Sequence, residues 1–126
     1  MQTPLRILIV DDEPGLRKLV TAILGSEGNT IDEAENGAKA LKMVSENVYD
    51  LIITDLVMPE VNGIDLIMAL KDRQYPGKII AVSGGGGITG RFDYLEISEI
   101  IGANSILSKP FTEDDIKDLI SSLFKD

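Results

Sequence analysis

Four short, continuous apolar runs constrain the fold of this chain more than any other feature. They are residues 7–10, 51–53, 79–82 and 106–107. Each run is apolar without alternation, which is typical of strands that are buried on both faces of a sheet. A weaker candidate strand covers residues 30–34, and its two acidic residues favour an edge position. The chain therefore has five candidate strands, of which the second and the fifth are polar enough to be edges.

Amphipathic helices are predicted between and after these runs. Apolar residues recur with the i, i+3, i+4, i+7 spacing of a helix within residues 16–24 and 116–124. Pro14 suits the first position of the first helix, and Thr112 with Asp115 resembles a capping box for the last. The remaining helices are expected after a cap at Asn36, over about residues 62–73 and over about residues 92–101.

Strand and helix patterns thus alternate five times along 126 residues, a length that suits a single domain over residues 1–126. Such alternation predicts an α/β protein with a parallel sheet and helices on both faces. The strand order 2-1-3-4-5 puts the apolar first and third strands in the centre, giving a doubly wound (βα)5 fold. Because the chain begins with Met1 and its last helix is complete, we expect it to stand alone.

The charge and the missing residue types exclude several kinds of function. A net charge of −9 and a pI near 4.4 disfavour direct binding to nucleic acid or to anionic membranes. The chain has no cysteine and no histidine, which excludes disulfides, thiol catalysis and the commonest transition-metal ligands. No segment approaches the ~20 apolar residues of a membrane span, and no signal peptide is recognisable. We therefore expect a cytoplasmic protein.

Polar side chains follow four of the five predicted strands at the point where each strand ends. They are Asp11, Asp12, Asp55, Ser83 and Lys109. In an open parallel sheet, ligands bind beyond the carboxyl ends of the strands, near the switch in strand order. Here that switch lies between the first and the third strand. Any one of these residues alone would be a helix cap or a surface residue, but their convergence on one edge predicts a functional site.

The residue types at this edge favour metal-assisted phosphoryl chemistry. Three carboxylates within a few ångströms repel one another, and a hard divalent cation relieves that repulsion. Oxygen ligands without histidine or cysteine favour Mg²⁺. Asp55 is central and can accept a phosphoryl group, while Lys109 supplies a movable positive charge. Ser83 can donate a hydrogen bond to a phosphoryl oxygen.

Five short motifs follow one another in order along nearly the whole chain: Val10-Asp11-Asp12-Glu13-Pro14, Thr54-Asp55-Leu56-Val57-Met58-Pro59, Asn62-Gly63, Ser83-Gly84 and Lys109-Pro110-Phe111. Together they resemble the receiver domain of two-component response regulators, of the stand-alone kind found in chemotaxis. The resemblance implies a flavodoxin-like fold and an aspartyl-phosphate at Asp55. It also implies a phosphoryl donor that is a histidine kinase or a histidine phosphotransfer protein. The output would be a conformational change read by a downstream protein, or onward transfer of the phosphoryl group.

The resemblance implies a role for each residue of the metal site. Asp12 and Asp55 would bind Mg²⁺ directly, Asp11 would act mostly through a metal-bound water, and the backbone carbonyl of Val57 would complete the shell. Glu13 is expected to point away from the metal, as a cap or an outer-shell group.

The resemblance also assigns the phosphoryl contacts to Ser83 and Lys109, and makes the Lys109–Pro110 bond cis, as a tight turn can require. One departure from the family is Ile106, where many members have an aromatic residue that moves on activation. We expect a monomer, or a dimer through the face of the fourth helix, fifth strand and fifth helix.

Three alternatives remain open. A nucleotide- or flavin-binding module is suggested by Gly85, Gly87 and Gly90, which match G-x-G-x-x-G, although that motif belongs after the first strand. An aspartyl-nucleophile phosphatase would carry a second acid two residues after Asp55, where this chain has Val57. A degenerate, scaffold-only receiver would lack acceptor or metal residues, and none is missing here. We therefore expect a phosphoacceptor signalling domain that catalyses only its own phosphorylation and dephosphorylation.

Overall fold

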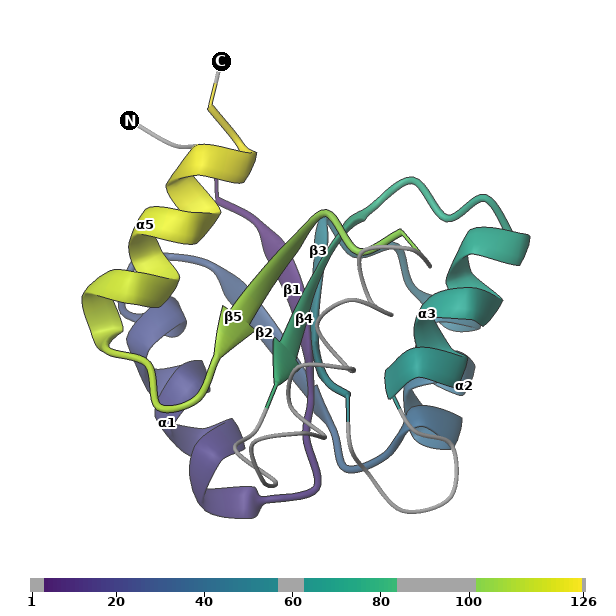
Figure 1. Ribbon diagram of the computed structural model, residues 1–126, viewed down its shortest axis with the longest axis horizontal. Coiled ribbons are helices and arrows are strands. Elements are labelled where there is room, and N and C mark those ends of the chain that lie inside the picture. The colour runs from purple at the N-terminus through teal and green to yellow at the C-terminus, as the bar shows by residue number, and fades with distance from the viewer. Residues whose placement is uncertain (1–3, 57–62, 84–101, 126) are drawn as a thin grey trace.

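The computed structural model describes residues 4–56, 63–83 and 102–125, which form one twisted sheet with helices on both sides (Figure 1). The strands are β1 (Arg6–Val10), β2 (Thr30–Ala34), β3 (Leu51–Asp55), β4 (Lys78–Ser83) and β5 (Ser105–Ser108). The helices within the described residues are α1 (Pro14–Gly25), α2 (Gly37–Glu46), α3 (Gly63–Asp72) and α5 (Glu113–Leu123).

All neighbouring strands are parallel, and their order is β2-β1-β3-β4-β5. This confirms the predicted doubly wound fold, with the two more polar strands at the edges. The helix expected over residues 92–101 lies outside the described residues. Because the strands are parallel, their carboxyl ends share one edge of the sheet, so residues from distant parts of the sequence meet there.

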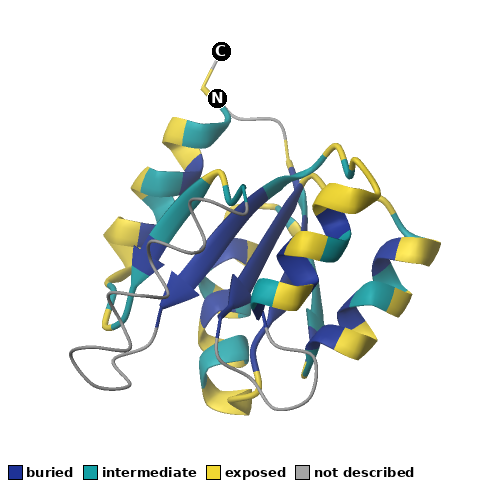
Figure 2. Cartoon of the chain, turned by 45° about the vertical axis from the view of Figure 1, so that its right-hand side comes forward, coloured by how far each residue is buried: buried dark blue, intermediate teal, exposed yellow. Residues whose placement is uncertain are grey.

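Side-chain alternation divides the core between the two faces of the sheet. On β1, Ile7 and Ile9 pack with α1 and α5, whereas Leu8 and Val10 pack with α2 and α3. Strands β3 and β4 alternate in the same way, and their described residues are almost wholly buried (Figure 2). Burial on both faces is the reason why these strands read as continuous apolar runs.

The helix starts follow the sequence signals. Pro14 is the first residue of α1, and the Asn36 side chain accepts a hydrogen bond from the Lys39 backbone at 2.8 Å. Thr112 and Asp115 form the expected capping box of α5. Within the described part of the chain, no helix has the length and apolar character needed to cross a membrane.

Candidate functional site

Strand register brings Asp11 and Asp55 side by side at the carboxyl edge of the sheet. Val10 pairs with Thr54, so the next residues, Asp11 and Asp55, lie at the same level of the sheet. Side chains alternate, so Asp55 points to the same face as Ile53, under α1 and α5. Both carboxylates are buried, with Asp11 4% and Asp55 5% exposed. Two buried acids in adjacent strands are costly unless something compensates their charge.

The loop after β1 is held by hydrogen bonds to Asp11. The backbone N–H of Asp11 donates to the Ala34 carbonyl at 3.2 Å, which extends the pairing of β1 with β2. Its carboxylate Oδ1 accepts from the Glu13 backbone N–H at 2.8 Å. Its carbonyl accepts from the Arg17 guanidinium at 2.6 Å. The start of this acidic loop is therefore fixed by β2, by the first turn of α1 and by its own backbone.

Asp11, Asp12 and Asp55 each offer one carboxylate oxygen, and these oxygens all lie within 4.8 Å of one another. The donor set is oxygen only, which fits Mg²⁺. Asp12 is exposed, so the group opens to solvent on one side. Burial raises the pKa of Asp11, as do the charges of Asp55 and Glu13, and these effects outweigh the opposing hydrogen bond from the Glu13 backbone and the charge of Lys109. Both the donor set and the crowding of charge therefore suit a divalent cation.

The Lys109 ammonium reaches into this group from the end of β5. Its Nζ lies 3.1 Å from Asp55 Oδ2, 3.5 Å from Asp11 Oδ2 and 3.4 Å from Glu13 Oε1. Burial lowers the pKa of Lys109, but the charges of Asp55, Asp11 and Glu13 raise it by more, so it stays protonated at neutral pH. Lys109 thus supplies a fixed positive charge beside the Asp55 carboxylate.

Ser83 lies beside Lys109, because the Lys109 backbone N–H donates to the Ser83 carbonyl at 2.8 Å. The Ser83 hydroxyl is buried and has no hydrogen-bond partner among the described residues. The Lys109–Pro110 bond is cis, as expected. Asp11, Asp12, Asp55, Ser83 and Lys109, here called the carboxyl-edge site, are thus brought to one edge as the sequence predicted. Val57 lies outside the described residues.

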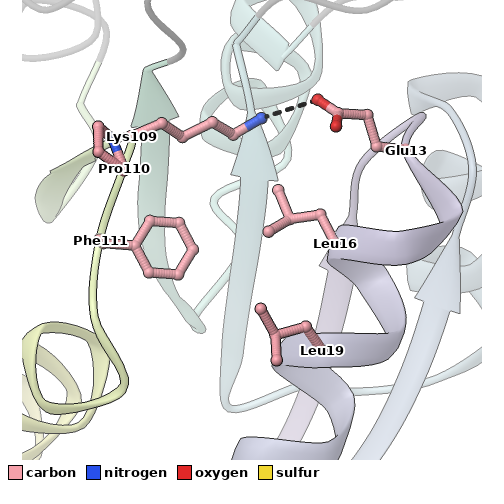
Figure 3. Close-up of a pocket in the computed structure, with 6 residues that line it drawn as sticks. All are labelled: Glu13, Leu16, Leu19, Lys109, Pro110 and Phe111. Atoms are coloured by element: carbon pink, nitrogen blue, oxygen red, sulfur yellow. Dashed lines mark hydrogen bonds and ion pairs between the residues drawn. The ribbon is translucent and has the colours of Figure 1, made fainter.

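Glu13 lies outside the group of three carboxylates, as expected of an outer-shell residue, but its side chain does not point away. Glu13 is the N-cap residue of α1, with extended backbone, but its side chain makes no capping hydrogen bond. Instead of pointing away, the carboxylate turns toward the site and pairs with Lys109 (Figure 3). The reason is electrostatic. The Lys109 ammonium lies within reach of the Glu13 carboxylate, and their opposite charges attract each other.

Sequence reasoning also missed Arg17. The residue lies three and seven positions before Val20 and Leu24, which are the two buried residues of α1. It is therefore on the inward face of the helix, and only 16% of its side chain is exposed. An arginine on a buried stripe is a recognisable signal, because an inward-facing charge requires partners.

An open groove of about 360 Å³ adjoins the carboxyl-edge site between α1 and the turn after β5 (Figure 3). Its wall is largely apolar, and Leu19 is 55% exposed. The ion pair of Glu13 with Lys109 spans one end of it. The lining residues are Glu13, Leu16, Leu19, Lys109, Pro110 and Phe111.

Comparison with known proteins gives a consistent result. The family model of the response regulator receiver domain matches residues 7–121. Sporulation initiation phosphotransferase F of Bacillus subtilis is 31% identical over 115 residues, covering 91% of this chain and 90% of that protein. Chemotaxis protein CheY of Halobacterium salinarum is 32% identical over 118 residues, covering 94% and 95%. The chain covers only 53% and 47% of other, longer relatives.

The solved structures agree with the sequence comparison. A response regulator receiver domain protein from Clostridium thermocellum has a TM-score of 0.85 at 27% identity, covering 94% of this chain and 93% of that one. The fold and the carboxyl-edge site define a doubly wound α/β protein with an acidic pocket and a lysine beside its central carboxylate. The chain belongs to the response regulator receiver domain family.

Proposed function

We propose that this chain is a phosphorylation switch in which Asp55 accepts a phosphoryl group from a phosphohistidine of another protein. The observation that carries the proposal is the contact of Lys109 Nζ with the Asp55 carboxylate at 3.1 Å, beside Asp11 and Asp12. The chain has no histidine, so the donor must be external: a histidine kinase or a histidine phosphotransfer protein. In the reaction the P–N bond of the donor breaks and a P–O bond to Asp55 forms.

Each residue of the carboxyl-edge site has a separate role in the proposed reaction. Asp12 and Asp55 would hold Mg²⁺ directly, with Asp11 acting through water and the Val57 carbonyl completing the shell. When bound there, the ion would supply positive charge that offsets the charge of the phosphoryl oxygens. Lys109 can keep its ammonium near Asp55 and pair with a phosphoryl oxygen as the charge at Asp55 changes. The buried Ser83 hydroxyl is available to donate a hydrogen bond, because no described residue accepts from it.

The proposed output is a change in partner binding, or onward transfer of the phosphoryl group to a phosphotransfer histidine. The name of one relative, sporulation initiation phosphotransferase F, supports onward transfer. An aromatic switch is excluded because Ile106, partly exposed on β5, occupies that position. Outside these steps the domain turns over no substrate, and we propose that it works in the cytoplasm as a monomer or as a dimer through the α5 side.

The acceptor can be tested with the whole chain, Mg²⁺ and a small acyl phosphate as donor. Intact-mass spectrometry should show the gain of one phosphoryl group, which hydroxylamine removes. Asp55→Asn should gain none, because an amide is a poor nucleophile. Asp50→Asn is the matched control, because Asp50 lies just before β3, the strand that ends at Asp55. The amide oxygen of the new side chain can still accept the hydrogen bond from the Arg6 backbone N–H, so labelling should persist. Undiminished labelling of Asp55→Asn would refute the assignment.

The donor class can be tested separately at the groove. The groove has an apolar wall and is lined by Lys109, which pairs with Asp55. Such a surface suits contact with a protein donor, whereas a small phosphodonor does not need it. Leu19→Glu should therefore slow transfer from a phosphohistidine protein at least about tenfold, since it puts a charge into an apolar contact. Labelling by the acyl phosphate should be unchanged. Equal effects on both donors would argue against a protein donor docking at the groove.

A further inference from the structure

Arg17 joins three separate segments around the carboxyl-edge site. Its Nη1 donates to the Asp11 carbonyl at 2.6 Å, and its Nε lies 3.3 Å from the Glu33 carboxylate on β2. The side chain comes from the first turn of α1 and is largely buried, with 16% exposed. A guanidinium can serve two acceptors at once with separate N–H groups in one plane, which an ammonium cannot do with the same geometry.

The bond from Arg17 completes the hydrogen bonding of Asp11. The N–H of Asp11 donates to Ala34, one carboxylate oxygen accepts from Glu13, and the other faces Lys109. The remaining polar group is the carbonyl, which accepts the hydrogen bond from Arg17. That carbonyl belongs to the planar peptide unit that leads into Asp12, so fixing its direction fixes the plane from which Asp12 starts.

We propose that Arg17 is a positioning residue of the metal site: it locks the Asp11–Asp12 peptide so that the Asp12 carboxylate meets those of Asp11 and Asp55. This inference rests on the proposed Mg²⁺ site. Arg17 itself supplies no oxygen ligand and acts only through the backbone carbonyl that it holds. Without it, the peptide can rotate, and the exposed Asp12 carboxylate must be ordered by the cation itself, which weakens binding.

The sign of the effect separates positioning from simple electrostatics. Removing a positive charge near a cation site should tighten cation binding if charge alone matters. Loss of positioning should weaken it instead. Groups that orient metal ligands from outside the coordination shell typically contribute 10–100-fold to affinity.

The experiment measures Mg²⁺ binding to the whole chain by isothermal titration, with stability in EDTA followed by circular dichroism. Arg17→Lys keeps the charge and should weaken Mg²⁺ binding about fivefold to tenfold. Arg17→Met keeps the apolar stem and should weaken it about tenfold or more, despite the lost positive charge. Lys18→Met, the exposed next residue, is the charge-matched control and should bind as tightly as the parent or slightly more tightly.

A destabilised variant at the far end of the sheet shows whether lost stability alone moves the affinity. Asn47→Ala removes the bond to Arg6 and should lower stability without changing Mg²⁺ binding. If Arg17→Met does not fold, Arg17→Lys alone decides, since its charge is that of the parent. Unchanged binding by Arg17→Lys would overturn this inference but leave the metal site standing. Failure of the parent to bind Mg²⁺ would overturn the metal site, and the inference with it.

Discussion

The two ends of the sheet use the same residue types in opposite ways. At the carboxyl end, four acidic side chains gather, and the ammonium of Lys109 lies within 3.5 Å of three of them. At the other end, polar side chains form an amino-end network in which donors and acceptors are matched. The members of this network are Arg6, Asp32, Asn47, Tyr49, Asp50 and Tyr75.

The amino-end network is centred on Tyr49, which is 1% exposed. Its hydroxyl donates to the Asp32 carboxylate at 2.7 Å, and its backbone N–H donates to the Tyr75 hydroxyl at 2.6 Å. The Arg6 guanidinium lies 5.2 Å from the centre of the Tyr49 ring and donates to Asn47 at 2.7 Å. In each of these polar contacts a donor of the chain meets an acceptor or an aromatic ring of the chain.

The difference predicts which end should stabilise the chain and which end should bind ligands. Matched polar groups contribute to stability, because burying them leaves little unsatisfied. Crowded like charges do the reverse, and they persist where an external ion or group relieves them. Substitutions at the amino end should therefore change stability and leave ligand binding alone, while those at the carboxyl edge should do the opposite.

The largest expected effect is on metal binding at the carboxyl edge. Asp12→Ala should weaken Mg²⁺ binding about a hundredfold, because it removes one of the two direct oxygen ligands that we propose. Glu13→Ala should change it only slightly, since Glu13 pairs with Lys109 and is outside the group of three carboxylates. Isothermal titration ranks the two variants, and equal losses would contradict the assigned roles. Neither variant should lose stability in EDTA.

At the amino end, Gly77→Ala should destabilise the chain by about 2 kcal/mol through overpacking. A Cβ on Gly77 would lie 2.5 Å from the Tyr49 carbonyl oxygen and 2.7 Å from the Tyr75 ring. Gly25→Ala is the control, because its Cβ would meet nothing within 4 Å. Urea unfolding measures both. Mg²⁺ affinity of Gly77→Ala should equal that of the parent, and a parallel loss would break the comparison.

Tyr49→Phe should lower the free energy of unfolding by about 1.5 kcal/mol, because it removes the hydrogen bond to Asp32. It should also change the response to alkali. Burial, followed by the hydrogen bond and charge of Asp32, raises the pKa of Tyr49 above its ordinary value of 10.0. The unfolded chain then loses this proton first, so stability falls as pH rises above 10. The fall should be shallower in Tyr49→Phe; an identical profile would show that Tyr49 does not cause it.

The smallest expected effect is a gain in stability at the carboxyl edge. Burial and the charges of Asp55 and Glu13 raise the pKa of Asp11, so its ionised form at pH 7 opposes folding. Asp11→Asn should therefore raise the free energy of unfolding in EDTA by about 0.5 kcal/mol. The variant removes the repulsion between Asp11 and Asp55, but it also removes part of the attraction to Lys109. The gain should vanish near pH 3, where the parent carboxyl is protonated. A loss of stability at pH 7 would place Asp11 with the stabilising groups of the amino end.

The sequence by itself determined the fold and the membership of the carboxyl-edge site. Apolar runs, helix periodicity and caps such as Asn36 are local signals, and their alternation leaves few topologies for a parallel sheet. Because parallel strands end at one edge, the residues after β1, β3, β4 and β5 had to converge. Asp11, Asp55, Ser83 and Lys109 could be placed together without any coordinates.

Only the tertiary structure decided which of these side chains touch, and what holds them. Glu13 turns inward because Lys109, 96 residues away, brings a positive charge within reach. Arg17 donates to the Asp11 carbonyl and to the Glu33 carboxylate at the same time, because the register of β1 with β2 brings Glu33 close to the guanidinium. Periodicity tells which face a residue takes, but an ion pair depends on ångström distances between segments far apart in the chain, and those distances exist only once the sheet and its helices have packed.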